Sequence, residues 1–126
     1  MTKKSETGKL GEDIAYEYLK KNGYSVIDRN FRRPWGEVDI IAKDKKGILV
    51  FVEVKTMEKN ESLKPEDNLT SEKLKKMKRT ASIYANSNEK LLTKNLGWRI
   101  DLVAIELLTD SIKDVDDYSV RHYENI

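Results

Sequence analysis

Three charged side chains on two neighbouring apolar segments are the part of this sequence best suited to chemistry. Asp39 lies in the segment 36–42, and the most apolar segment of the chain, 48–56, contains Glu53 and Lys55. A charge in an otherwise buried strand costs several kcal/mol unless a partner compensates it. Two carboxylates beside one ammonium group are suited to holding a divalent cation and to activating water against a phosphodiester. The three residues therefore predict a hydrolytic site.

The turn between the two segments decides whether the acids meet. Asp44-Lys45-Lys46-Gly47 predicts a tight hairpin that ends in a left-handed glycine. In that turn residue 44 pairs with residue 48, which places Asp39 opposite Glu53 and Glu37 opposite Lys55. Directly opposed side chains have Cβ atoms about 4.5–5.5 Å apart, where two like charges destabilise a sheet unless a cation lies between them. A register shifted by two residues would leave both acids on one face.

Strict alternation along the strands predicts which side chains share a face. On the segment 48–56, Glu53 and Lys55 share a face with Phe51. On the segment 36–42, one face carries Glu37, Asp39 and Ile41, and the other carries Val38, Ile40 and Ala42. The alternative is a solvent-exposed hairpin whose charges form cross-strand ion pairs. The apolar character of the second segment favours the metal site.

The elements that must position these residues alternate between helices and strands. Helical spacing of apolar residues predicts helices at 7–22 and 71–86, the second capped by Thr70 or Ser71. Strands are expected at 24–32, 37–42, 48–56, 98–107 and 118–123, with the third at the centre. The polar segment 57–69 predicts a lid or substrate loop. The order α-β-β-β-α-β-β predicts one α/β domain over 1–126, a mixed sheet of about five strands flanked by helices.

Composition excludes several classes of function. The chain has no cysteine and one histidine, which removes disulfides, thiolate metal sites and multi-histidine metal sites. No apolar run reaches the ~18 residues of a membrane span, so we expect a cytoplasmic protein without a membrane partner. Lys and Arg number 24 against 22 Asp and Glu, a net charge of +2. Contact with nucleic acid therefore requires a local basic face.

Two groups of basic residues are candidates for that face. The first consists of three arginines just before the acidic strand: Arg29, Arg32 and Arg33. Arginine binds phosphate through paired N–H groups, and these residues are therefore candidate phosphate contacts. The alternative is a solvated loop. For Trp35 we expect that the ring covers the core. The second consists of two lysines on one side of the helix 71–86: Lys73 and Lys76. A solvated helix face explains most of the other charges there, and Asp101 is interpreted as the partner of Arg99.

Five spaced motifs carry a resemblance to a known family. They are Gly11-Glu12 with Ala15 and Tyr18-Leu19, Gly23-Tyr24, Arg29-Asn30-x-Arg32, Gly36 to Ala42, and Phe51 to Lys55. Together they resemble the YraN-like family of uncharacterised bacterial proteins, which looks like a branch of the PD-(D/E)XK nucleases. The motif order is similar to that of archaeal Holliday-junction resolvases. The resemblance covers about residues 8–106 and implies a restriction-endonuclease-like fold.

The same resemblance implies an activity and assigns roles to residues. Asp39 and Glu53 become ligands of Mg²⁺ or Mn²⁺, Lys55 the catalytic lysine, and Glu12 a further acid of the site. Glu12 borders the apolar stripe of the first helix, but a solvated glutamate favoured by the helix dipole is an equal alternative. The implied reaction is hydrolysis of phosphodiester bonds, with structured or branched DNA expected ahead of RNA. A homodimer is expected because junction nucleases act in pairs on two-fold substrates.

Two further interpretations stay open at this point. The family pattern has an arginine two residues after Lys55, where this chain has Met57. That difference and the modest net charge favour a nucleic-acid-binding module that keeps the nuclease fold without cleaving. The third interpretation is a protein-interaction domain whose charges are all solvated, which predicts no change of melting temperature with metal.

Overall fold

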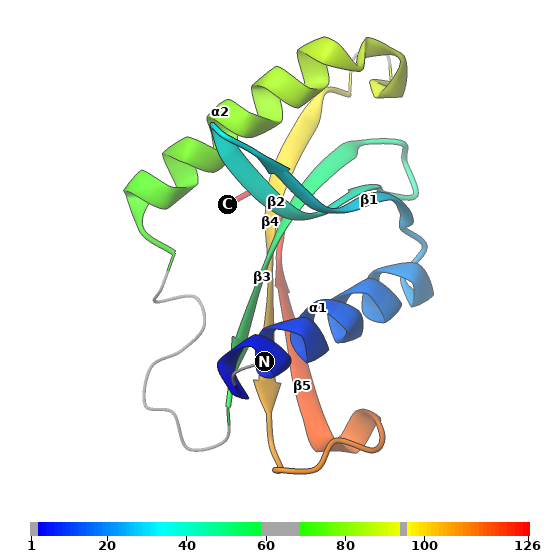
Figure 1. Ribbon diagram of the computed structural model, residues 1–126. Coiled ribbons are helices and arrows are strands. Elements are labelled where there is room, and N and C mark those ends of the chain that lie inside the picture. Colours follow the sequence, from blue (N-terminus) through cyan, green and yellow to red (C-terminus); the bar gives the residue numbers. More distant parts are fainter. Residues whose placement is uncertain (1–2, 59–68, 94–95) are drawn as a thin grey trace.

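The computed structural model describes residues 3–58, 69–93 and 96–126 and shows a mixed sheet between helices (Figure 1). The sheet has five strands in the order β1-β2-β3-β4-β5, with β3 and β4 parallel and the other neighbours antiparallel. The elements are α1 Lys3–Lys21, β1 Ser25–Arg33, β2 Gly36–Lys43, β3 Leu49–Met57, α2 Ser71–Ser87, η2 Glu89–Leu91, β4 Trp98–Leu107, η3 Val115–Asp117 and β5 Tyr118–Tyr123. The predicted fold class, the order of elements and the central position of the third strand are confirmed.

The sheet separates two apolar clusters, each covered by one helix. α1 packs on one face and α2 on the other, and β3 supplies alternate residues to both: Val50, Val52 and Val54 toward α1, and Leu49 and Phe51 toward α2. Because both of its faces are buried, this strand is also the most apolar stretch of the sequence. None of the helices in the described part of the chain is long and apolar enough to cross a membrane.

The β2–β3 hairpin has the predicted register. Ile40 pairs with Val52, and the pairing continues to the turn. The Asp44 N–H donates to the Ile48 carbonyl at 3.0 Å, and Gly47 adopts φ +90°. The Asp44 carboxylate also accepts the N–H groups of Lys46 and Ile48, each at 2.9 Å. Local turn chemistry therefore sets the alignment of the two strands that carry the candidate site.

The helix ends agree with the sequence at three of four termini. Gly23 adopts φ +86° and closes α1, and Thr70 Oγ1 accepts the Lys73 N–H at 3.1 Å to begin α2. α1 begins at Lys3 rather than at residue 7, because the apolar pattern starts only at Leu10 and cannot mark a polar first turn. Most of the predicted loop 57–69 lies outside the described residues.

Strict alternation along β2 is wrong at Val38. This residue packs in the α2 cluster with Ile41, although alternation predicts opposite faces for the two. On β1, Asn30 adopts φ +53°, between the paired positions Arg29–Ile40 and Phe31–Val38. The pairing keeps its register across Asn30, and Phe31, the partner of Val38, packs edge-on against Tyr84 of α2.

α1 and β3 approach each other most closely at Gly11. A Cβ on Gly11 would overlap Thr56 Oγ1, whereas a Cβ on Gly8 of the same helix would meet no atom within 4 Å. Glycine therefore allows the helix to lie against the end of β3 at Thr56, and the next residue, Glu12, is held beside the end of that strand.

The substitution Gly11→Ala is expected to lower the free energy of unfolding by about 1–3 kcal/mol, because the added methyl group forces α1 away from Thr56. Gly8→Ala is the matched control, and it is expected to raise that free energy by about 0.5–1 kcal/mol through helix propensity alone. Urea denaturation of the three proteins measures both values. Equal effects of the two substitutions would contradict the close approach.

Candidate functional site

The candidate site lies where β2 separates from β3. Regular pairing of the two strands ends at Ile40–Val52, and Figure 1 shows them diverging from their common turn. One residue further, Asp39 Oδ2 accepts the Val54 N–H at 2.8 Å, so that a side chain replaces the backbone ladder. This contact fixes the Asp39 carboxylate on β3, between Glu53 and Lys55 in sequence. The predicted convergence of Asp39 with the charged end of β3 is present, although the pairing that was expected to produce it stops earlier.

The expected position of Glu37 opposite Lys55 is wrong. Glu37 is exposed and forms an ion pair with Arg32 of the neighbouring strand β1. Because β2 bends away from β3 beyond Ile40, its first residues interact with β1 rather than with β3. Lys55 instead has Glu53 of its own strand as an ion-pair partner, with 3.7 Å between Nζ and Oε1.

The two acids of the site repel each other. Burial, and then the charge of Glu53, raises the pKa of Asp39 to about 7 from 3.8, against the opposing hydrogen bond from Val54. Glu53 has a side chain only 8% exposed. Two carboxylates in one desolvated place favour a proton or a cation between them. A divalent cation between the two carboxylates would relieve this repulsion.

Two lysines neutralise part of this charge. Lys73 comes from α2, and its Nζ lies 2.9 Å from Glu53 Oε1, closer than that of Lys55. Burial, followed by the hydrogen bond and the charge of Lys73, lowers the pKa of Lys55. Burial opposes the charge on Lys73, but its hydrogen bonds to Lys55 and Glu53 outweigh this, and its pKa lies above the usual value. Lys73, predicted as a phosphate contact on an outer face, thus lies at Glu53.

Glu12 reaches the same site from α1. Its Oε1 atom is buried and has no hydrogen-bond partner among the described residues. Burial raises the pKa of Glu12, the charges of Arg29 and Arg32 oppose the increase, and the charge of Glu53 contributes to it. The helix approach at Gly11 therefore brings a third carboxylate within the field of the first two.

Asp39 and Glu53 offer the carboxylate oxygens that hard divalent cations prefer. Within residues 3–58, 69–93 and 96–126, no three His, Cys, Asp or Glu side chains form a ready metal-binding group. Asp39 and Glu53 alone would supply two carboxylates, and Mg²⁺ is commonly held by one or two carboxylates, with water and substrate oxygens as the other ligands. The unsatisfied Oε1 of Glu12 is a further acceptor for such a water. Asp39 and Glu53 are therefore the residues that would hold a metal here.

The three predicted arginines lie along β1, and each has a side-chain contact within the protein. Arg29 pairs with Asp13 at 2.7 Å, and Arg33 lies over the ring of Phe31. Arg29 and Arg32 both act on Glu12, which places their charges beside the site. Lys76 is exposed on α2. Trp35, which was expected to cover the core, is instead 43% exposed in the β1–β2 turn.

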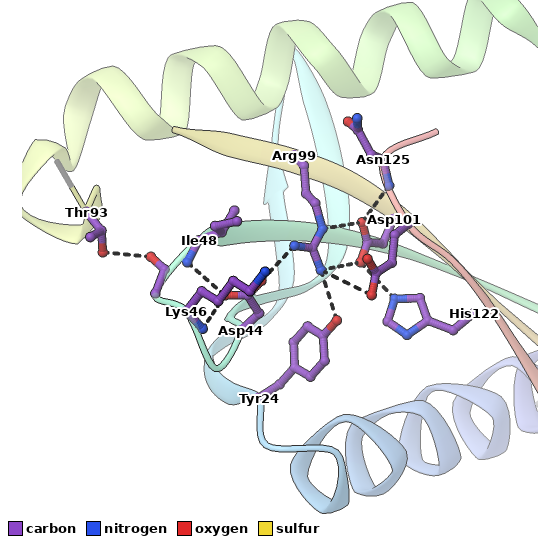
Figure 2. Close-up of polar contacts among 11 residues, drawn as sticks. Tyr24, Asp44, Lys46, Ile48, Thr93, Arg99, Asp101, His122 and Asn125 are labelled. Carbon is purple, nitrogen blue, oxygen red and sulfur yellow. Dashed lines mark hydrogen bonds and ion pairs between the residues drawn. The ribbon is translucent and has the colours of Figure 1, made fainter. Parts of the chain in front are cut away.

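A second polar cluster lies on the α1 face of the sheet (Figure 2), and the sequence predicted only one of its contacts. Asp101 is fully buried, and its carboxylate accepts from Arg99 Nε at 2.9 Å and from the Asn125 N–H at 3.0 Å, and meets His122 Nε2 at 2.7 Å. Arg99 also donates to Asp44 at 2.7 Å and to the Tyr24 hydroxyl at 2.9 Å. The predicted pairing of Arg99 with Asp101 is confirmed.

This cluster is separate from the candidate site. It borders a pocket of about 340 Å³ near the β2–β3 turn, lined by Tyr18, Tyr24, Asp44, Arg99 and His122 among others. The part of β3 from Leu49, beside the turn, to Lys55 is about 20 Å long at the usual rise of a strand. The contacts of the polar cluster join the β2–β3 turn, β4 and the end of the chain, which indicates a structural role. Of the contacts in this cluster, only the pair Arg99–Asp101, two residues apart, could be predicted from the spacing of residues in the sequence.

Comparisons with known proteins agree on one group of sequences. The family model described as uncharacterised protein family UPF0102 matches residues 11–105. A UPF0102 protein of Flavobacterium johnsoniae is 35% identical over 97% of this chain and 94% of its own length. Another, of Thermodesulfovibrio yellowstonii, is 37% identical over 95% of this chain and 94% of its own. A third, of Dictyoglomus turgidum, is 41% identical over 81% and 83%.

Proposed function

This chain belongs to the uncharacterised protein family UPF0102, the YraN-like group that its motifs resemble, and from that premise we propose metal-dependent hydrolysis of phosphodiester bonds in nucleic acid. The single observation that supports the proposal most is the junction of β2 and β3. There Asp39 and Glu53 repel each other in a desolvated place beside Lys55, whose pKa is lowered. Perturbed titration of several groups at one point is typical of catalytic sites.

Asp39 and Glu53 would hold Mg²⁺ or Mn²⁺, which supplies charge neutralisation at the phosphate and a more acidic water when bound. The protein's own part is to hold the two carboxylates in place. The Val54 N–H fixes Asp39 at 2.8 Å, and Glu53 is fixed between two lysines. Glu12 Oε1, which has no partner in the described part of the chain, would accept a hydrogen bond from a water of the site.

Lys55 would take the proton of the attacking water. Its lowered pKa increases the fraction of neutral amine at a given pH, and only the neutral form accepts a proton. In the hydrolytic step the water oxygen forms a bond to phosphorus as the bond to the leaving sugar oxygen breaks. The proton passes to Lys55 Nζ, and the leaving oxygen takes one from solvent. No covalent intermediate is needed.

The surface around the site suits a polyanion. Arg29 and Arg32 of β1 lie beside Glu12, and Lys76 is exposed on the helix that supplies Lys73. Trp35 is exposed in the turn that joins β1 and β2, and Gly36 of that turn lies against Thr80 of α2. Basic residues with an exposed aromatic ring are suited to phosphate contact and base stacking. We favour DNA, branched or structured, and a homodimer stays a prediction that sedimentation would test.

A panel of substrates tests the proposal. Single-stranded, duplex and four-way-junction DNA, and duplex RNA, are incubated with the protein in Mg²⁺, in Mn²⁺ and in chelator. We expect cleavage of at least one DNA that requires the metal and is lost in Glu53→Gln purified in the same way. Cleavage that persists in chelator, or equally in the variant, would indicate a contaminant or a different site.

One observation favours a second candidate, a nucleic-acid-binding module without cleavage. Met57, at the position where the family pattern has an arginine, is only 5% exposed and packs as an apolar residue. The site therefore has no cation at that position to bind a phosphate. Salt-dependent DNA binding without product in any metal would select this candidate over the nuclease.

A further inference from the structure

Glu53 has a closer partner than the lysine of its own motif. Lys73 Nζ lies 2.9 Å from Glu53 Oε1, whereas Lys55 Nζ lies 3.7 Å away. Glu53 is nearly buried, so few groups can approach this oxygen. Lys73 is held in place from its other end, because its backbone N–H is bound by Thr70 at the first turn of α2. The start of the helix thus directs an ammonium group onto the carboxylate.

A divalent cation bound through Oε1 of Glu53 would need the space that this ammonium group occupies. Mg²⁺ binds carboxylate oxygens at about 2.0–2.1 Å and keeps water around it. Two positive groups on one carboxylate in a place of low solvation repel each other strongly. Lys55 already approaches the same Oε1 oxygen, at 3.7 Å, so a metal ion on that oxygen and Lys73 cannot both remain there.

We propose that Lys73 is the resident counter-ion of Glu53 in the metal-free protein and that a divalent cation binds by displacing it. This inference rests on the proposed metal site and adds that Lys73 determines how tightly a metal binds there. Lys73 keeps the buried acid paired when the metal is absent, and it competes with the metal for that acid. Lys73 is accordingly a positioning residue rather than a catalytic one.

If Lys73 and the metal exchange on Glu53, removing the Lys73 ammonium group lowers the stability of the metal-free protein and raises its affinity for the metal. Loss of the ammonium group leaves Glu53 with the more distant Lys55, so the metal-free protein melts lower, by about 5 °C for one charged hydrogen bond. The same loss removes the competitor, so the dissociation constant for Mn²⁺ falls by about tenfold. At saturating Mn²⁺ the two proteins melt together, because Lys73 is displaced in the wild type.

The experiment compares wild type, Lys73→Met, Lys73→Arg and Lys75→Met. Lys75 is an exposed lysine of the same helix, so its variant controls for the loss of one positive charge. Melting is measured in chelator and across a Mn²⁺ titration, and calorimetry gives the dissociation constants without nucleic acid. Lys73→Arg, which keeps the charge, and Lys75→Met are expected to bind Mn²⁺ as the wild type does.

The outcomes separate this inference from the proposed function. Tighter Mn²⁺ binding in Lys73→Met alone supports the exchange. If the wild type binds Mn²⁺ and Lys73→Met binds it equally or more weakly, the exchange is overturned and the metal site stands. If neither protein binds Mn²⁺, the metal site and the exchange are both overturned.

Discussion

Replacing Lys55 by methionine is expected to lower the rate of metal-dependent phosphodiester cleavage by about 10²–10⁴-fold, the usual contribution of a general base. Methionine keeps much of the length of the lysine side chain and removes the amine. Glu53 retains its closer partner Lys73 at 2.9 Å, so we expect the fold to be preserved. The variant therefore separates the chemical role of Lys55 from a role in stability.

The pH dependence of cleavage gives a second measurement of the same role. Burial is the largest cause that lowers the pKa of Lys55, and it remains when a metal displaces Lys73, so the neutral amine becomes available at a lower pH than for an ordinary lysine. The wild-type rate is expected to rise with pH until Lys55 is neutral, and the residual rate of Lys55→Met to lack that rise. Single-turnover cleavage of the substrate found in the panel measures both. A variant with the wild-type rate and pH profile would remove Lys55 from the mechanism.

Asp39→Asn is expected to raise the free energy of unfolding of the metal-free protein by about 2–4 kcal/mol at pH 8.5, although it removes a functional group. The pKa of Asp39 is about 7 in the folded protein against an ordinary 3.8. Above pH 7 the folded state must hold a half-buried anion beside Glu53, and the amide avoids this cost. The amide oxygen can still accept the Val54 N–H.

The sign of this effect depends on pH. A group whose pKa is raised in the folded state contributes stability below its unfolded pKa, and this contribution is lost as pH rises through the folded value. The difference between Asp39→Asn and wild type is therefore expected to be small near pH 4, to grow between pH 4 and 7, and to level off above pH 7. Asp101 and Asp44, whose pKa values are lowered, act equally in both proteins and cancel.

Under the proposed function, Mn²⁺ is expected to reverse the order of stability of the wild type and Asp39→Asn. Mn²⁺ is expected to stabilise the wild type and to leave Asp39→Asn nearly unchanged, because the variant lacks one of two anionic ligands. Urea denaturation at pH 4, 6 and 8.5, with and without Mn²⁺, measures the whole pattern. A variant less stable than wild type at pH 8.5 in chelator would contradict the burial of a repelled carboxylate.

Much of the framework could be predicted because the features that decide it are local. Asp44 and Gly47 set the hairpin register through contacts within five residues, and the alternation of β3 marks it as buried on both faces. Asp39 lies on one strand of that hairpin, and Glu53 and Lys55 lie on the other. The hairpin register brings them near one another, and the contact of Asp39 with the Val54 N–H completes their convergence, because the regular pairing ends at Ile40.

Other parts of the site depend on how separate elements pack. The contact of Lys73 with Glu53 needs the position of α2 on the sheet, and the place of Glu12 needs the approach of α1 at Gly11. Val38 packs in the α2 cluster and Asn30 of the neighbouring strand is left-handed, and strict alternation predicts neither. Periodicity reports which side of a helix is apolar, but not how far the helix is turned or tilted.

By itself the sequence determined the order of elements, the hairpin register and the strand that carries two charges into the core, because turn residues and apolar spacing act over a few positions. Only the tertiary structure decided which lysine binds Glu53, since that contact joins residues twenty positions apart through the packing of a helix on a sheet. The same holds for Arg99, whose partners Asp44 and Tyr24 come from distant parts of the chain. Side-chain contacts between elements follow from helix position and strand twist, which no local pattern specifies.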